Sequence, residues 1–219
     1  MTSELLQHLN YTQQEYTSLG YYTKLFDILK TKNIESYIDI GANIGEVCNI
    51  YFNNIPTLKK AYLFEVNTHT FELLKTNIKH KDLIDLYNKA IYYGSKPPKI
   101  FNKDNNIGLT MIGNDTIDIV QSRANLYGFQ DGGEILNYTT LEELNLPLVD
   151  LIKIDIEGAE FNIIDNSKYL HTVKYLEIEF HHQHSNIDID QYILNTFLNH
   201  KVILAEDSKG RFLFERNDL

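Results

Sequence analysis

The chain has 219 residues, of which 43% are hydrophobic, and its formal net charge is −10 at pH 7. This composition is typical of a globular protein with a full core and excludes a disordered chain. The negative charge without a basic run excludes a general nucleic-acid-backbone binder, and the lack of an apolar run of about 18 residues excludes a transmembrane helix.

The single cysteine, Cys48, permits no internal disulfide, so nothing in the sequence requires an oxidising compartment. We expect Cys48 to be a small buried residue of the core. The first residues lack a basic segment followed by an apolar one and do not resemble a secretory signal. We therefore expect one domain over residues 1–219, located in the cytoplasm.

The N-terminal part, residues 1–31, predicts two helices broken near Gly20 that cover a sheet or form a lid. The second helix has an apolar face made of Tyr22, Leu25, Phe26 and Leu29. Strands are expected at 36–40, 61–66, 83–91, 149–155 and 173–180, and helices at 45–53, 68–79, 157–169 and 188–198. This alternation predicts a parallel sheet with right-handed crossovers.

Two segments depart from the alternation. Glycines and prolines punctuate residues 93–138, which predicts an insertion of hairpins and loops that binds the substrate. Thr139 and Thr140 each precede a glutamate by three residues, and these two overlapping capping boxes predict a short helix. Alternation at 202–205 and 212–214 predicts a C-terminal hairpin, after a helix capped by Asp188 or Asp190.

The most informative segment is the turn after the first strand, Asp39-Ile40-Gly41-Ala42-Asn43-Ile44-Gly45. Its glycines permit a tight turn and let a ligand lie against bare backbone. Glu65 ends the second strand about 20 residues past the turn, the offset at which an acid accepts both hydroxyls of a ribose. The pattern predicts a nucleoside-type cofactor across the carboxyl ends of a doubly wound sheet.

The glycine spacing discriminates between cofactors. A dinucleotide fingerprint needs glycine where this chain has Asn43 and Glu46. An acid at Glu46 opposes a pyrophosphate, so a cofactor without phosphates is favoured over NAD or FAD. S-adenosylmethionine fits, because it carries a ribose, an adenine, a sulfonium and an amino acid. Asp39 is then a candidate to receive its ammonium group, directly or through water.

The same turn resembles motif I of class I S-adenosylmethionine-dependent methyltransferases. The block Asp150-Leu151-Ile152-Lys153-Ile154-Asp155-Ile156-Glu157-Gly158-Ala159-Glu160 is similar to the signature of FkbM-type methyltransferases. The segment Phe64-Glu65-Val66-Asn67 also resembles that family, which usually has proline where this chain has Val66. The resemblance covers roughly residues 36–181. It implies an α/β, Rossmann-like fold: a mostly parallel seven-stranded sheet with helices on both faces and a C-terminal antiparallel hairpin.

The resemblance also implies cofactor-binding residues, with the end of the third strand meeting the adenine. They are Asp39, Gly41, Ala42, Asn43, Gly45, Glu65, Val66, Asn67, Asn88, Ala90 and Asp155. For Glu65 the alternative is a cap on the following helix. The corresponding alternative for Glu160 is an acid that complements a helix dipole.

Candidates for the chemistry lie at the ends of the fourth and fifth strands. Methyl transfer is an in-line displacement, so the protein must align the nucleophile and remove its proton. Asp155, Glu157 and His181 are candidates for the base, the last because imidazole titrates near neutral pH. Lys153 is expected to pair with Asp155, Glu177 or Glu179, as a structural ion pair or as a substrate contact.

The run His181-His182-Gln183-His184 raises the alternative of a divalent metal that acidifies a substrate hydroxyl. Because no spaced second ligand pair accompanies it, a metal is not favoured. The sequence thus favours O-methylation of a small-molecule or sugar hydroxyl, with S-adenosylhomocysteine as product. The alternatives are an N-methyltransferase, a non-catalytic binding protein of the same fold, and an NAD-dependent oxidoreductase. The acceptor is expected to bind residues 1–30 and 93–138, and the oligomeric state is open.

Overall fold

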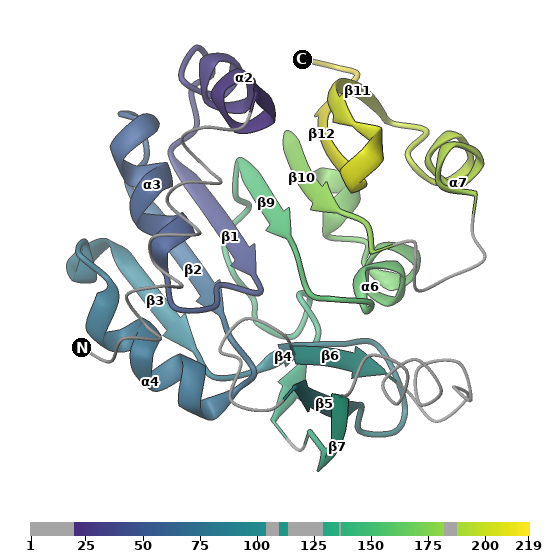
Figure 1. The fold of residues 1–219 in the computed structure, drawn as a ribbon. Coiled ribbons are helices and arrows are strands. Elements are labelled where there is room, and N and C mark those ends of the chain that lie inside the picture. The colour runs from purple at the N-terminus through teal and green to yellow at the C-terminus, as the bar shows by residue number, and fades with distance from the viewer. Residues whose placement is uncertain (1–19, 104–109, 114–128, 136, 182–187) are drawn as a thin grey trace.

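The computed structural model describes residues 20–103, 110–113, 129–135, 137–181 and 188–219. Its centre is a seven-stranded sheet in the order β11-β12-β10-β9-β1-β2-β3 (Figure 1). The strands are β1 (Ser36–Ile40), β2 (Lys60–Phe64), β3 (Ile84–Tyr87), β9 (Leu151–Ile154), β10 (Tyr175–Glu179), β11 (His200–Glu206) and β12 (Arg211–Arg216). Strands β10, β9, β1, β2 and β3 are parallel to one another. Strand β12 is antiparallel to both of its neighbours, β10 and β11. The expected mostly parallel sheet and its C-terminal hairpin are confirmed.

Helices cover both faces of the sheet. The apolar cluster on one face includes buried residues of α2 (Gly20–Leu29), α3 (Glu46–Asn54) and α4 (Thr68–Asn77). The cluster on the other face includes residues of α6 (Glu160–Asn166) and packs against α7 (Ile189–Thr196). Short 3-10 turns lie at Lys81–Leu83, Leu170–Thr172 and Asp207–Lys209. All four residues of β9 are buried, as expected for the central strand of a sheet covered on both sides.

The N-terminal expectations are confirmed where they can be compared with the structure. The second predicted helix is α2, and it buries the apolar face that the sequence indicates, together with Tyr21. The first predicted helix lies outside the described residues. None of the helices in the described part of the chain combines the length and the apolarity that a bilayer span needs.

Within the predicted insertion at 93–138, the described residues form a separate small sheet. Its strands are β5 (Lys99–Lys103), β6 (Thr110–Gly113) and β7 (Phe129–Glu134), antiparallel in the order β6-β5-β7. Figure 1 shows this small sheet beyond the carboxyl ends of the central strands. It therefore stands on the side of the sheet on which a doubly wound fold binds ligands.

Two predicted elements are wrong in detail. The strand expected at 83–91 divides, because β4 (Ala90–Ile91) leaves the central sheet and pairs with β8 (Tyr138–Thr139). The helix expected after Thr140 is a turn, although Thr140 and Glu143 make both hydrogen bonds of the capping box, at 3.0 and 3.2 Å. Asn145 has a φ of +49°, which ends the helical conformation after one turn.

Two helix starts depend on particular residues. The helix expected from Glu157 begins at Glu160, because Glu157 and Gly158 have φ values of +52° and +115° and form a turn. Asp188, rather than Asp190, caps α7 by accepting a hydrogen bond of 3.1 Å from the Gln191 N–H.

Candidate active site

The turn after β1 packs directly on the end of β9. Gly41, Asn43 and Gly45 all have positive φ, at +93°, +51° and +82°. The Gly41 and Ala42 N–H groups both donate to the Phe64 carbonyl at 3.0 Å. A Cβ on Gly41 would lie 2.0 Å from the carbonyl oxygen of Asp155, so glycine is the residue that this close approach permits. Ala42, predicted to contact the cofactor, has its side chain buried in the core.

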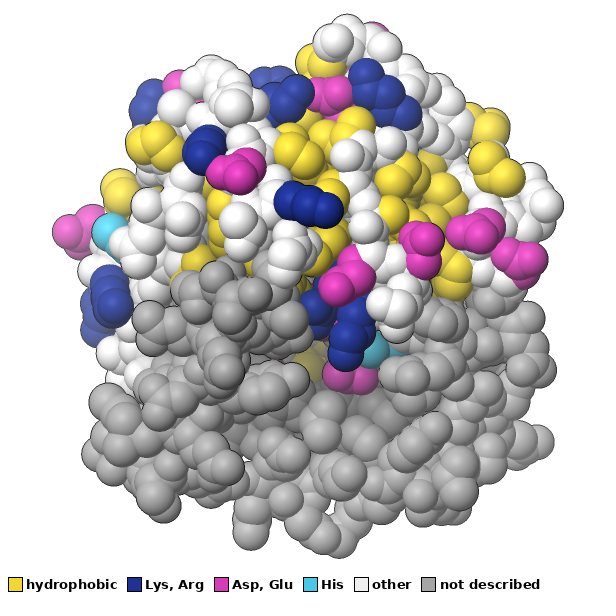
Figure 2. Space-filling view, turned by 45° about the horizontal axis from the view of Figure 1, so that its top comes forward, with side chains coloured by type: hydrophobic (Ala, Val, Ile, Leu, Met, Phe, Trp, Pro, Cys, Tyr) yellow, Lys and Arg dark blue, Asp and Glu magenta, His cyan; other side chains and the backbone are white. Residues whose placement is uncertain are grey.

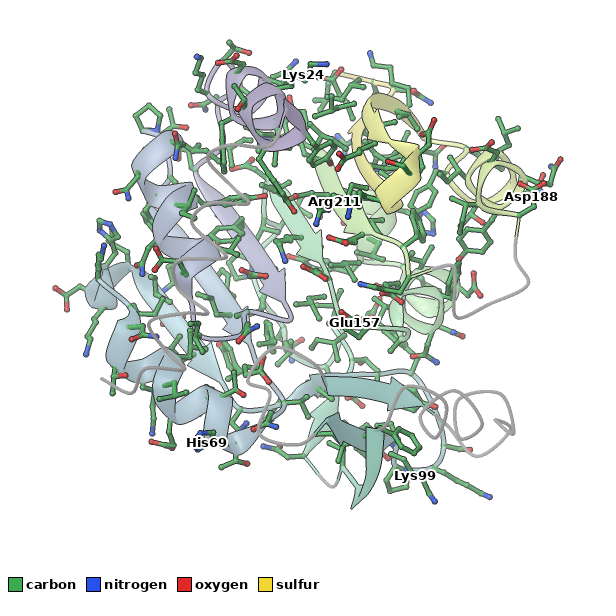
Figure 3. The ribbon with its side chains drawn as sticks, viewed as in Figure 1. Lys24, His69, Lys99, Glu157, Asp188 and Arg211 are labelled. Carbon is green, nitrogen blue, oxygen red and sulfur yellow. The ribbon has the colours of Figure 1, made fainter. Side chains whose placement is uncertain are left out.

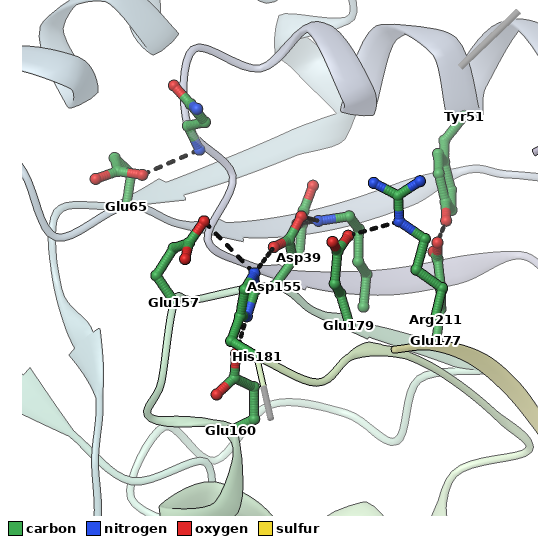
Figure 4. Close-up of polar contacts among 12 residues, drawn as sticks. Asp39, Tyr51, Glu65, Asp155, Glu157, Glu160, Glu177, Glu179, His181 and Arg211 are labelled. Carbon is green, nitrogen blue, oxygen red and sulfur yellow. Dashed lines mark hydrogen bonds and ion pairs between the residues drawn. The ribbon is translucent and has the colours of Figure 1, made fainter. Parts of the chain in front are cut away.

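Glu65 closes this turn from the neighbouring strand. One of its oxygens accepts from the Asn43 N–H at 3.0 Å (Figure 4), and the other accepts from the Asn67 N–H at 2.7 Å. The cap of α4 is Asn67, which accepts from the Thr70 N–H at 3.1 Å, so the capping alternative for Glu65 is wrong. Burial raises the pKa of Glu65 to about 7, although these hydrogen bonds oppose the shift. Each oxygen retains a lone pair with which it can accept a ligand hydroxyl.

Asn88 fixes the loop that follows β2. Its side-chain amide donates to the carbonyls of Glu65 at 2.8 Å and Val66 at 3.0 Å, and its oxygen accepts from the Thr68 hydroxyl at 3.2 Å. Ala90 is buried and donates its N–H to the Asn137 carbonyl. The adenine contact expected for this strand end stays a prediction. In the structure, the hydrogen bonds of the Asn88 amide hold the loop that carries Glu65.

Three titratable residues, Asp39, Lys153 and Glu177, lie side by side on adjacent strands of the sheet. Lys153 is the register partner of Asp39 on one side and of Glu177 on the other. The Lys153 ammonium is 3.6 Å from Asp39 and 3.1 Å from Asp155, which confirms the predicted pairing with Asp155. Burial lowers the pKa of Lys153, but the two carboxylates outweigh burial and leave it raised, so this lysine stays charged.

The two acids on either side of Lys153 have different neighbours. Asp39 has no exposed surface, and burial raises its pKa against the opposing effect of Lys153. Glu177 is hydrogen-bonded to Tyr51 of α3, whose ring stacks on Tyr37 with centroids 5.2 Å apart. Burial raises the pKa of Glu177 well above its ordinary range, and the acids Asp39 and Glu179 act in the same direction.

Sequence reasoning missed Arg211, the first residue of β12. Because β12 runs antiparallel to β10, its start lies beside the end of β10, where Arg211 and Glu179 are register partners. Its guanidinium donates to Glu179 at 2.8 Å, lies 3.4 Å from Glu206, and stands 5.0 Å from the Tyr22 ring. A small polar cavity opens between these groups and the end of β9. Its lining includes Tyr22, Lys153, Asp155, Glu177, Glu179 and Arg211.

The strand ends bring together the predicted catalytic residues Asp155, Glu157 and His181 (Figure 4). Figure 3 shows Glu157 beyond the end of β9. Nε2 of His181 lies 3.4 Å from Glu157 and 3.8 Å from Asp155. Its Nδ1 contacts Glu160, a fully buried residue that the sequence interpretation placed at a helix dipole. Glu160 also accepts from the Gly158 N–H at 3.1 Å. Figure 2 shows cationic, histidine and acidic side chains gathered in the middle of one face of the molecule.

These neighbours change each titratable group differently. Burial would raise the pKa of Asp155, but Lys153 and His181 outweigh burial and lower it. Burial raises the pKa of Glu157 to about 7. Burial lowers the pKa of His181, but the carboxylates of Glu160, Glu157 and Asp155 more than offset it and raise it to about 10. Asp155 is therefore the weakest base of the three.

A metal centre finds no support in the described part of the chain. Among those residues, no group of three or more His, Cys, Asp or Glu side chains is arranged to hold a metal ion. His182 and His184, which the metal alternative needs, lie outside the described residues.

The chain resembles known proteins in sequence pattern and in fold. A family model described as the methyltransferase FkbM domain matches residues 39–204. The structure of an FkbM methyltransferase from Methylobacillus flagellatus KT is similar with a TM-score of 0.55 and 15% identity, over 91% of this chain and 47% of that one. The chain thus spans about half the length of that protein. The Escherichia coli protein yhhF, assigned as a methyltransferase, is similar with a TM-score of 0.50 and 10% identity, over 91% of this chain and 88% of its own. No curated protein matches the chain in sequence. The two structural likenesses show a shared fold.

Proposed function

The chain belongs to the FkbM methyltransferase family, and from this premise we propose that it transfers a methyl group from S-adenosylmethionine to a hydroxyl of a small molecule or sugar. The observation that carries the proposal is the pairing of Glu65 with the turn at 41–45. A buried carboxylate that still has lone pairs to offer stands beside a glycine turn at the carboxyl ends of β1 and β2. This is the arrangement that receives a ribose in doubly wound folds.

The residues around the turn suit this cofactor. Glu65 would accept the ribose hydroxyls, and the backbone of the turn would face the amino-acid part. Both carboxylate oxygens of Asp39 are buried without a hydrogen-bond partner, an acceptor available at the end of β1. With no exposed surface, Asp39 would act through an intervening water or through Lys153. Glu46, in the first turn of α3, opposes a phosphate-bearing cofactor.

The chemistry requires alignment and proton removal. Bound S-adenosylmethionine supplies a methyl group on a positively charged sulfur, which makes the carbon ready for displacement. The chain would hold the acceptor hydroxyl in line and take its proton. Three groups able to hold a proton, Asp155, Glu157 and His181, converge within 3.8 Å at the end of β9. This convergence favours a hydroxyl acceptor, which needs a base.

Calorimetric titration with S-adenosylmethionine and S-adenosylhomocysteine tests the cofactor assignment. We expect dissociation constants on the order of micromolar, lost in Glu65→Ala and retained in Glu72→Ala, an exposed acid of α4 paired with Lys75. NADH should not bind. Failure of the folded protein to bind S-adenosylmethionine would refute the proposal.

A second test addresses catalysis. Purified protein with S-adenosylmethionine is incubated with a panel of sugars and hydroxylated small molecules, and S-adenosylhomocysteine release is measured. We expect acceptor-dependent release that Glu157→Gln reduces. Release with amine acceptors alone would replace O-methylation by N-methylation. Tight cofactor binding together with a biological function that survives Asp155→Asn and Glu157→Gln would point to the non-catalytic alternative.

A further inference from the structure

His181 is enclosed by carboxylates on both sides of its ring. Nδ1 contacts Glu160, and Nε2 faces Glu157 at 3.4 Å and Asp155 at 3.8 Å. A carboxylate only accepts hydrogen bonds, and a neutral imidazole has only one N–H. The doubly protonated imidazolium is therefore the form that satisfies both sides, and a ring in that form has no lone pair with which to take a further proton.

Glu160 is the member of this group that cannot reach a substrate. It is fully buried in the first turn of α6, and it accepts from both the His181 ring and the Gly158 N–H. That second bond ties it to the turn that carries Glu157. Glu160 thus fixes the orientation of the imidazole and the conformation of the adjacent turn at the same time.

Glu157 is presented in a conformation that ordinary residues avoid. Its φ of +52°, followed by Gly158 at +115°, places its side chain at the end of β9 with 24% of its surface exposed. Non-glycine residues in this region of backbone space cost free energy and cluster at functional sites. Asp155, by contrast, is bound to Lys153 at 3.1 Å, an ion pair that would have to be weakened before it took a proton.

We propose that Glu157 is the proton acceptor of the reaction and that Glu160 is a positioning residue, which holds His181 as a fixed imidazolium facing Glu157 and Asp155. This inference rests on the proposed function. In the step, the acceptor oxygen forms the bond to the methyl carbon while the carbon–sulfur bond breaks, its electron pair staying on sulfur. The hydroxyl proton passes to the Glu157 carboxylate, and no other reactant is needed.

The surrounding charges agree with this division of roles. The charge of His181 interacts with four acids: Asp155 and Glu157 at the end of β9, Glu160 in α6 and Glu179 in β10. The two cations of the area, Lys153 and Arg211, are each paired with carboxylates of their own. The pKa of Glu157, raised to about 7 by burial first and then by acidic neighbours, suits a base that works near neutral pH.

Nuclear magnetic resonance of the unliganded protein tests the inference without an acceptor. With ¹⁵N-labelled histidine, both ring nitrogens of His181 should be protonated at pH 7. With ¹³C-labelled glutamate, the Glu157 carboxyl, assigned by its loss in Glu157→Gln, should titrate about two units above an exposed glutamate. A neutral His181 ring at pH 7, or a Glu157 midpoint near 4, would overturn the proposal.

The positioning role has its own readout. In Glu160→Gln, the His181 pKa should fall by more than one unit because the ring loses its Nδ1 partner, and the Glu157 midpoint should fall because Glu160 is one of the acids that raise it. Asp165→Asn, on the same helix but bonded to Tyr192, should change neither value. If Glu160→Gln does not fold, His181→Gln tests the facing charge instead, since the Glu157 midpoint should rise when the imidazolium that lowers it is removed. If the pKa values of His181 and Glu157 are unchanged in these variants, Glu160 has only a structural role and the positioning proposal is wrong.

The two proposals fail separately. Spectra recorded with S-adenosylhomocysteine show whether the cofactor site exists, whatever the charge of His181. Ligand-induced shifts together with a neutral His181 would contradict only the proton-acceptor assignment. A charged His181 without any ligand-induced shift would contradict the proposed function and leave the imidazolium geometry standing.

Discussion

The carbonyl oxygen of Asp155 occupies the space beside Gly41 so closely that a Cβ on that glycine would lie 2.0 Å from it. The two residues are more than a hundred positions apart in the chain, yet the turn proposed to hold the cofactor rests directly on the strand end proposed for the chemistry. The cofactor turn and the end of β9 are therefore in direct backbone contact.

Gly41→Ala should destabilise the protein, because the methyl group meets a backbone atom and the residue must keep a φ of +93°. We expect the free energy of unfolding to fall by roughly 2–5 kcal/mol. Gly20→Ala is the matched control, since nothing lies within 4 Å of the added methyl group and its φ is not strained. Urea denaturation of the two variants measures the difference; equal stabilities would contradict the close contact.

Lys153→Met should leave Asp39 as an uncompensated buried charge. Removing one partner of a buried ion pair costs about 3–5 kcal/mol of unfolding free energy. Adding Asp39→Asn to this variant removes the orphaned charge and should recover much of the loss. Chemical denaturation of the wild type, both single variants and the double variant completes the cycle. Additive effects would show that the two side chains, 3.6 Å apart, are not coupled.

Glu177→Gln should change the pH dependence of stability. The pKa of Glu177 is raised above 4.5 in the folded protein, mainly by burial. Above that pH the unfolded chain loses this proton while the folded protein keeps it, so the wild type loses stability as the pH rises. Glutamine does not ionise, and the variant should gain on the wild type between pH 4 and pH 8. Thermal melting at both pH values gives the comparison; a constant difference would contradict the raised pKa.

Cofactor affinity should depend on the protonation of Glu65. Its pKa lies at about 7 and its carboxylate form is the one that accepts two ribose hydroxyls, so affinity should increase as the pH rises from 6 to 8. The increase should approach about tenfold per pH unit below pH 7. Glu65→Gln should bind more weakly with a flat profile. The same slope in Glu157→Gln would show that Glu65, and not the proposed base, is responsible.

Local patterns carried much of the fold prediction. Strands β1, β2 and β9 are mostly apolar segments bounded by turn residues, and the hairpin of β11 and β12 forms where it is predicted, although the burial of β12 does not alternate. The sequence could not indicate that β4 leaves the sheet, because only Asn88 and Lys89 separate it from β3 and the two strands together have the length of one ordinary strand. That departure depends on pairing with β8, about fifty residues away.

The candidate site was predictable where it follows strand ends and not where it depends on packing. Asp155, Glu157 and His181 were expected from the parallel topology, and the structure brings them together. Glu160 was read as a helix acid, because its contact with His181 joins α6 to the residue after β10. Arg211 could be found only by extending the rule to an antiparallel strand, whose beginning stands where its parallel neighbour ends.

The order of the strands also governs how the sheet can assemble. β12 lies between β10 and β11, and β11 pairs with no other strand of the described sheet, although it comes first in the chain. In the described sheet, β11 therefore has a pairing partner only when β12 is in place. The two strands form their hairpin before β12 pairs with β10 or at the same time. Arg211 belongs to that hairpin, so the cavity at the end of β9 is complete only when β12 is paired with β10.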